Sequence, residues 1–153
     1  MAKRGGGSQS RNRYHDPIQF IKESDMAKLE GTPKQIAWAK DIRNKWIKDD
    51  YEHLRRLQGD LQQRAKTAEM HIKNGEDVKK NREILGYVKS WSKRNEIENQ
   101  AKKEMLSYIT SAKEIIELRG WFWEVSLDVI DVIKKKGSKK EIHDAIDGWL
   151  TGY

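Results

Sequence analysis

The chain has 153 residues, of which 36% are hydrophobic and 36% are charged, and its formal net charge is +7. This length suits one domain, and so few apolar residues form a core only if they gather on one face of each element, as in helical bundles. The absence of cysteine excludes disulfides and thiolate metal sites, and no apolar run is long enough to cross a membrane. We therefore expect an all-α cytoplasmic protein.

Residues 1–16 differ in composition from the rest of the chain. Their glycine- and serine-rich run, residues 5–10, is typical of a flexible linker, and no apolar segment of a secretory signal accompanies it. We predict a disordered basic arm over residues 1–16 and a helical domain over residues 17–153. The arm either follows a phosphate backbone or serves as a solubilising tail. Its basic residues are Lys3, Arg4, Arg11 and Arg13.

The helical domain begins with a short lead, residues 17–31, and a capped helix. We expect three apolar residues of the lead to pack on the core, namely Ile18, Phe20 and Ile21. Thr32 suits the N-terminal cap of a helix and Pro33 its first position. The residues expected on the inner face of this helix are Ile36, Ala39, Ile42 and Trp46.

A second helix is predicted from about Asp50 to Asn74. Apolar residues recur there every three or four positions, a period that matches a helix and excludes a strand. Asn74 and Gly75 then supply a left-handed stop. The inward residues of this helix are Tyr51, Leu54, Leu57, Leu61, Ala65, Ala68 and Ile72.

The next two helical patterns cover residues 77–91 and 97–118. The first has a weak apolar stripe, which is expected to face inward and consists of Ile84, Val88 and Trp91. The second has a strong stripe that ends before Gly120. Because no glycine or proline separates Trp91 from Ile97, the two patterns form either two helices or one long rod. The stripe of the second pattern is Ile97, Ala101, Met105, Tyr108, Ala112, Ile115 and Leu118.

Residues 121–137 are compatible with a strand or a helix. Apolar and polar residues alternate from Trp123 to Val129, as in a strand, but no second strand is available to pair with it. We therefore predict a helix that Gly137 ends. Ser138 and Glu141 have the spacing of a capping box, which predicts a last helix. The chain is thus expected to form a bundle of five or six helices.

The search for a catalytic set is negative. The four histidines form no metal-binding pair, and no phosphate-binding loop or nucleophile elbow is present. Asp128 and Asp131 share a helix face, but solvated helices carry such pairs routinely. We expect no enzymatic activity, no cofactor and no metal.

The clearest candidate binding site is a lysine cluster between the last two predicted helices. Its lysines lie at a helix end, a turn and a helix start, where free backbone amides favour a phosphate. Other basic groups, such as Lys89 and Lys93-Arg94, alternate with acidic residues and are typical of solvated faces. The cluster consists of Lys134, Lys135, Lys136, Lys139 and Lys140.

Tryptophans provide a second candidate. Trp46 lies on the inner stripe of its helix, whereas Trp38 lies off it. Trp121 and Trp123 flank Phe122, and we expect one of these three rings to face outward. Such rings either fill the core or serve as an anchor for a partner or an unpaired base.

The segment from Leu29 to Arg43 resembles a signature of small, largely uncharacterised proteins of bacteriophages and mobile elements, G-[ST]-x-K-Q-I-x-W-A-x-x-I-R. Its physical content is a capped amphipathic helix with Trp38 and Arg43 on its flank. The resemblance implies a phage or mobile-element origin, and therefore a bacterial host cell, rather than any activity.

Charge, arm and lysine cluster together favour a protein that binds nucleic acid or a host nucleoprotein complex. The resemblance implies that this protein is an accessory protein of a phage or mobile element. One alternative is a protein inhibitor of a bacterial defence complex such as CRISPR, which acts through a protein face. Another is a structural or assembly protein, which would self-associate.

Overall fold

The computed structural model describes residues 17–151, and the arm predicted over residues 1–16 lies outside them. The described part contains five α-helices, two short 3₁₀ helices and no β-strand, which confirms the all-α prediction. The helices are η1 (Glu23–Asp25), α2 (Pro33–Lys73), α3 (Val78–Tyr108), α4 (Ala112–Glu117), η2 (Leu118–Gly120), α5 (Phe122–Lys134) and α6 (Lys139–Thr151).

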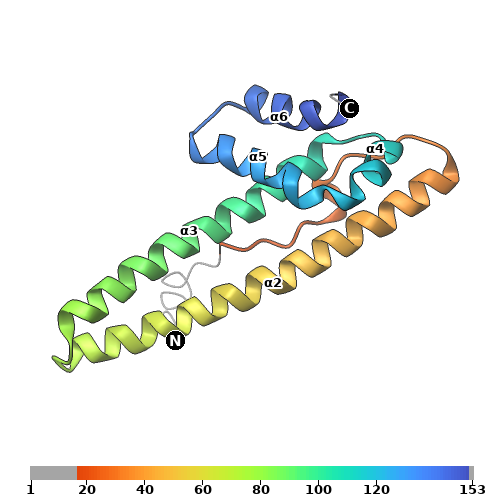
Figure 1. The fold of residues 1–153 in the computed structure, drawn as a ribbon. Helices are drawn as coiled ribbons and strands as arrows, with labels where there is room; N and C mark the ends of the chain where they lie inside the picture. Colours follow the sequence, from red (N-terminus) through yellow and green to blue (C-terminus); the bar gives the residue numbers. More distant parts are fainter. Residues whose placement is uncertain (1–16, 152–153) are drawn as a thin grey trace, which may run out of the picture.

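Helices α2 and α3 form a long antiparallel hairpin, and the remaining helices cover one end of it (Figure 1). The turn between them uses left-handed backbone at Gly75, with φ of 75°, and at Asp77, with φ of 41°. Glycine adopts this conformation without steric cost, so the stop predicted at Asn74 and Gly75 is confirmed.

Helix α2 is a single helix of 41 residues, whereas the sequence pattern predicted two. Its buried face runs without a break through Arg43, Ile47, Leu54, Gln58 and Leu61. Two of these residues are polar, and Leu57, which was expected to point inward, is 38% exposed. The apolar residues therefore shift to a different side of the helix near residue 50, although the helix itself continues.

Helix α3 is continuous through residues 91–97, so the two predicted patterns join there as in the single-rod alternative. The helix predicted over residues 97–118 nevertheless breaks after Tyr108. The Ser111 hydroxyl accepts a hydrogen bond from the Glu114 amide at 3.3 Å and so caps α4. Glu30 pairs with the break as a short parallel bridge, donating to the Thr110 carbonyl at 2.8 Å and accepting from the Ala112 amide at 2.9 Å.

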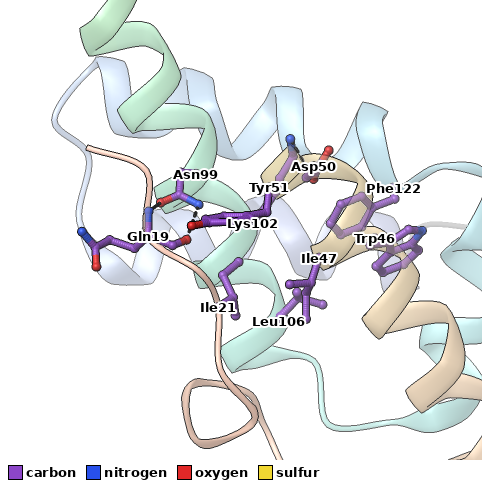
Figure 2. Close-up of a pocket in the computed structure, with 10 residues that line it drawn as sticks. All are labelled: Gln19, Ile21, Trp46, Ile47, Asp50, Tyr51, Asn99, Lys102, Leu106 and Phe122. Carbon is purple, nitrogen blue, oxygen red and sulfur yellow. Dashed lines mark hydrogen bonds and ion pairs between the residues drawn. The ribbon is translucent and has the colours of Figure 1, made fainter. Parts of the chain in front are cut away.

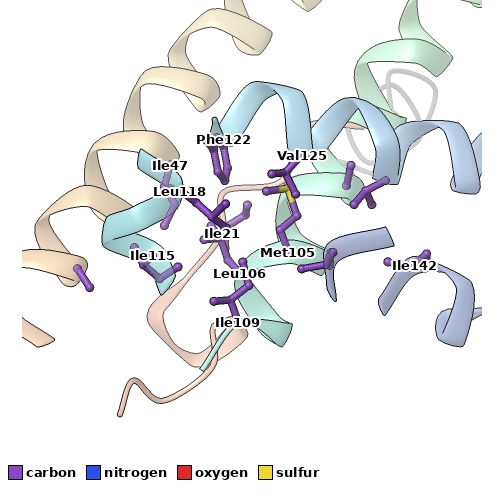
Figure 3. Packing of buried hydrophobic residues seen from close by; sticks show 14 of the residues in the cluster. Ile21, Ile47, Met105, Leu106, Ile109, Ile115, Leu118, Phe122, Val125 and Ile142 are labelled. Carbon is purple, nitrogen blue, oxygen red and sulfur yellow. The ribbon is translucent and has the colours of Figure 1, made fainter. Parts of the chain in front are cut away.

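The hydrophobic core lies at the covered end of the hairpin, where α4, α5 and α6 pack (Figure 3). Trp46 stacks on Phe122 with ring centroids 3.7 Å apart, which confirms that Trp46 faces inward. Residues 122–134 are helical, as predicted, and Ser138 and Glu141 form the predicted capping box of α6. The largest fully buried apolar side chains are Leu54, Met105, Leu106, Ile109, Ile115, Val125, Val129 and Ile146.

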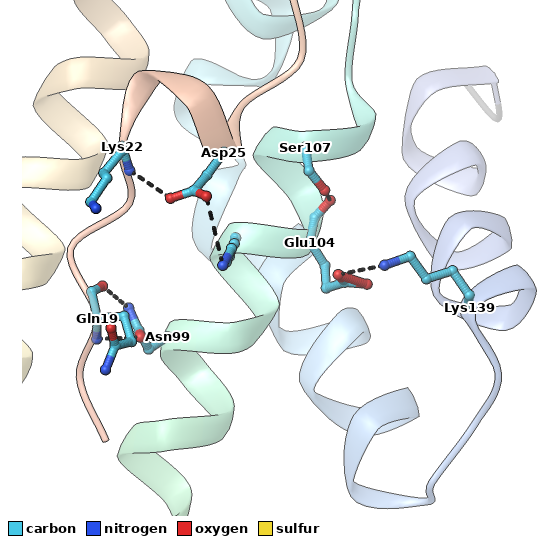
Figure 4. Close-up of polar contacts among 8 residues, drawn as sticks. Gln19, Lys22, Asp25, Asn99, Glu104, Ser107 and Lys139 are labelled. Carbon is cyan, nitrogen blue, oxygen red and sulfur yellow. Dashed lines mark hydrogen bonds and ion pairs between the residues drawn. The ribbon is translucent and has the colours of Figure 1, made fainter. Parts of the chain in front are cut away.

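The lead, residues 17–31, is held against the hairpin by polar contacts. Gln19 exchanges two backbone hydrogen bonds with the Asn99 side chain, at 2.8 and 2.9 Å (Figure 4). The Arg43 guanidinium donates to the Ala27 carbonyl at 2.7 Å and is only 1% exposed, so the expected position of Arg43 on the helix flank is wrong. Ile18 and Ile21 are buried as expected, but Phe20 is 51% exposed.

Candidate functional site

The turn after α5 positions the predicted lysine cluster. Lys136 takes the left-handed position, with φ of 59°, and its amide donates to the Ile133 carbonyl. The Gly137 amide donates to the Val132 carbonyl at 2.9 Å, which completes a Schellman-type helix end. Gly137 ends the helix, as predicted. Its role is steric and not a left-handed backbone, since a Cβ there would lie 2.5 Å from Val132 Cγ1.

Three of the five lysines are paired with acidic residues. Lys135 lies 3.3 Å from Asp131 and Lys140 lies 3.0 Å from Asp144, each one turn away on its own helix. The Asp144 hydrogen bond and charge raise the pKa of Lys140. Lys139 reaches across to α3 and pairs with its Glu104 at 3.0 Å (Figure 4).

The start of α6 also has its own internal partners. The Ser138 amide donates to the Glu141 carboxylate at 3.0 Å, and the Glu141 amide donates to the Ser138 hydroxyl at 3.2 Å. Two amides that would face a phosphate are thus already bonded. The cluster is therefore divided among several contacts, and only part of it faces an open site.

That open site is a groove of about 640 Å³ between one face of α3 and Lys134, the last residue of α5. The α3 residues recur at helical spacing, so they form one continuous stripe. Four of the groove's residues are basic and none is acidic. We call this site the basic groove; it is lined by Gly86, Lys89, Ser90, Trp91, Lys93, Arg94, Ile97 and Lys134.

The basic residues of the groove differ in their pairing. Lys93 pairs with Glu96 at 3.0 Å, and Arg94 pairs with Glu98 at 3.5 Å. Within residues 17–151, Lys89 and Lys134 have no acidic partner, and both are exposed. These two lysines therefore hold the uncompensated charge of the groove.

An indole lies beside these charges. Trp91 is 39% exposed, so its expected inward position is wrong. The Arg94 guanidinium lies 5.1 Å from the centroid of its ring. The ring centroid of Tyr87, on the same helix, lies 6.0 Å from the ring centroid of Trp91. Exposed aromatic rings beside phosphate-binding groups are typical of surfaces on which unpaired bases stack.

The predicted indoles lie at the opposite end of α5 from Lys134. Trp121 is 55% exposed, and Trp123 is 44% exposed with the Lys102 ammonium 5.4 Å from its ring. Phe122, between them, is buried. Since α5 has 13 residues, the lysine and tryptophan parts of the predicted site are about 20 Å apart.

The α3 half of the groove was not predicted from the sequence. Lys89, Lys93 and Arg94 were assigned to solvated faces because acidic residues interleave with them. The spacing of four residues between Lys89 and Lys93 is the available signal, since it places these two lysines on one side of a helix. The basic residues predicted in the arm, Lys3, Arg4, Arg11 and Arg13, lie outside the described residues.

Among residues 17–151, neither the void beneath the lead nor any cluster of metal-binding residue types offers a further site. The void beneath the lead, beside Lys102 and Asn99, has a volume of about 10 Å³, no larger than one water molecule (Figure 2). No group of three histidine, aspartate or glutamate residues in this range is placed to hold a metal ion. Across residues 17–151, no helix is both long and apolar enough for a membrane span.

None of the protein-family models, curated proteins and solved structures compared with the chain matches it. The resemblance of residues 29–43 to bacteriophage and mobile-element proteins therefore stays a prediction. What those residues do in this fold is clear from their contacts. Thr32 and Gln35 cap α2 reciprocally, Ala39 is fully buried, and Arg43 holds the lead, so these four residues stabilise the fold.

Proposed function

We propose that the protein is a non-enzymatic nucleic-acid-binding protein that holds a phosphate backbone in the basic groove. The observation that supports this most is the convergence of Lys134 with three basic residues of α3 around an open groove without an acidic lining. Two unpaired lysines at such a groove attract a polyanion, and the net charge of +7 adds a favourable long-range field.

The test compares two double variants that remove equal charge. Lys89→Gln with Lys134→Gln removes the unpaired lysines of the groove. Lys135→Gln with Lys140→Gln, the matched control, removes two lysines that pair on their own helices. All four side chains are exposed, so each variant should keep the thermal midpoint of the parent within the small effect of a surface charge.

Binding is measured by fluorescence anisotropy with a labelled duplex and a labelled single strand, over a series of salt concentrations. Each lost phosphate contact lowers the slope of log affinity against log salt by about 0.9 for a duplex and about 0.7 for a single strand. The groove variant should therefore lose nearly two units of slope on a duplex, and the control should lose little. No binding at low salt, or equal loss in both variants, overturns the proposal.

Trp91 separates the two forms of nucleic acid. Stacking of an unpaired base on an aromatic ring contributes about 1–3 kcal/mol. Trp91→Ala should therefore weaken single-strand binding by about 5- to 150-fold and change duplex binding little. Equal weakening of both would instead show that Trp91 acts by orienting Arg94.

A further inference from the structure

A second open site has the opposite chemistry to the basic groove. It is a pocket of about 450 Å³ between α4, the turn that follows it and the end of α6. Two of its residues are acidic, two are indoles and two are leucines, and none is basic. We call it the acidic-aromatic pocket; its residues are Glu114, Glu117, Leu118, Trp121, Trp149 and Leu150.

The two indoles form a wall that is held in place. The Trp121 and Trp149 ring centroids are 6.0 Å apart, with an angle of 35° between the rings. The Trp149 Nε1–H donates to the Asp128 carboxylate at 2.7 Å, which fixes the orientation of that ring before any ligand arrives. Trp121 is 55% exposed, so part of the wall remains open to a ligand. The negative face of an indole attracts an organic cation.

The carboxylates of the pocket lack strong partners. Within residues 17–151, Glu114 has no ion pair and its side chain accepts no hydrogen bond. Glu117 lies 3.9 Å from Lys113, but both side chains are well exposed, and such a pair contributes little. Burial, followed by the charges of Glu117 and Asp147, raises the pKa of Glu114. A cation in the pocket would relieve this crowding of negative charge.

We propose that the acidic-aromatic pocket binds a lysine or arginine side chain of a partner protein. The leucines suit the apolar stem of such a side chain, and the indoles and carboxylates suit its charged end. An anion would be repelled by Glu114 and Glu117, and an apolar group would leave them without compensation. A bare metal ion would find too few oxygen ligands, since indoles supply none. The pocket thus matches a side chain that joins a methylene stem to a positive charge.

The binding test uses capped pentapeptides in which glycines flank one central residue. The central residue is lysine, arginine or the uncharged norleucine, and the readout is the indole N–H resonances of Trp121 and Trp149 in ¹⁵N-labelled full-length protein. The lysine and arginine peptides should shift both resonances at millimolar concentration, with smaller shifts at high salt. No shift, or an equal shift with norleucine, overturns the proposal.

Variants locate the binding and exclude a general charge effect. Glu114→Gln should weaken binding of the lysine peptide at least fivefold and leave the thermal midpoint unchanged or raised. Glu69→Gln removes the same charge from an exposed position of α2, outside the pocket, and should bind the peptide as the parent does. Equal peptide binding in the parent and in Glu114→Gln contradicts the assignment of the site.

A final arm identifies the source of the cation. Butylammonium has the stem and charge of lysine but no peptide backbone. If the cation belongs to a protein, the lysine peptide should bind more tightly than butylammonium, because backbone contacts at the rim add to the interaction. Equal affinity would show that the pocket takes a small ammonium compound, and the partner-protein proposal would then be wrong.

Discussion

The ion pair between Lys102 and Asp50 gives the sharpest stability prediction, because its two ends differ in solvent access. The Lys102 Nζ lies 2.8 Å from Asp50 Oδ2, and the Lys102 side chain is only 4% exposed, against 30% for Asp50 (Figure 2). The Trp123 ring lies 5.4 Å from the same ammonium. Removing either charge breaks the same pair but leaves a different residue behind.

The magnitudes follow from what remains. Asp50→Asn leaves a buried ammonium without a counter-charge, which costs about 3–5 kcal/mol. Lys102→Met keeps most of the buried volume and leaves a carboxylate that can turn toward water, so its cost should stay below about 1.5 kcal/mol. The free energies of unfolding of the two variants should therefore differ by about 2 kcal/mol or more.

Urea denaturation followed by circular dichroism measures this difference. If Asp50→Asn unfolds too readily to be measured, the double variant remains informative: adding Lys102→Met removes the uncompensated charge and should restore most of the lost stability. The reasoning is refuted if Lys102→Met costs as much as Asp50→Asn, or if the double variant is the least stable of the three.

Further predictions concern two separate glycines, a buried pair of side-chain amides and a carboxylate. Gly59→Ala should raise the free energy of unfolding by up to about 1 kcal/mol, because Gly59 is inside α2 with nothing near its missing Cβ; Gly137→Ala, which meets Val132, should lower it, and urea denaturation distinguishes the two. Gln58→Ala should cost about 1–3 kcal/mol, since it removes the acceptor of the buried Asn95 amide at 3.2 Å, while replacing both residues by leucine should cost less. Glu114→Gln should stabilise the fold slightly at pH 7. Folding raises the Glu114 pKa, so the folded state disfavours the charged carboxylate; the gain should disappear as the pH falls below the ordinary glutamate pKa of about 4.3, where the carboxyl is protonated in both states. A gain that persists at pH 3 would contradict that cause.

Sequence periodicity predicted the helices well wherever apolar residues occupy the buried positions. It predicted α6 and the end of α2, where caps and stripes agree, whereas α5 was predicted as a helix because no second strand was available to pair with it. It failed inside α2 because Arg43 and Gln58 are buried through tertiary partners, the Ala27 carbonyl and the amide of Asn95. Hydrophobic patterning has no means of assigning a polar residue to the core when its partner lies 16 or 37 positions away in the chain.

The break after Tyr108 is a second feature that hydrophobic patterning does not predict. The apolar stripe continues from Tyr108 through Ala112 and Ile115 at helical spacing, so nothing in the period indicates an interruption. The backbone leaves the helix because Glu30, far away in the chain, pairs with it, and because Ser111 begins a new helix. A serine inside a helical pattern signals such a cap only when its side chain is free to bond the backbone.

The candidate site was half predicted for a related reason. Lys134 was predicted as a site residue because it belongs to a cluster of lysines that are close together in the sequence. Lys89, Lys93 and Arg94 become its neighbours only when α5 packs across α3. The acidic residues that made the α3 group resemble an ordinary surface, Glu96 and Glu98, do not line the groove. Basic and acidic residues that alternate along the sequence can thus lie on different sides of a helix.

The two proposed sites have opposite charge and lie at opposite ends of α5. Trp121 precedes the helix and Lys134 ends it, a separation of about 20 Å for 13 residues. No single small ligand satisfies both sites, but a basic protein bound to nucleic acid presents a phosphate backbone and cationic side chains together. Such a partner would engage the second site at a high effective concentration, so its affinity would exceed that for either component alone. A double-mutant cycle of the groove and pocket variants tests this. For one nucleoprotein partner, the losses of binding free energy in the two variants should differ from a simple sum by a coupling energy. For separate ligands, each variant should weaken only the binding of the ligand that its own site takes.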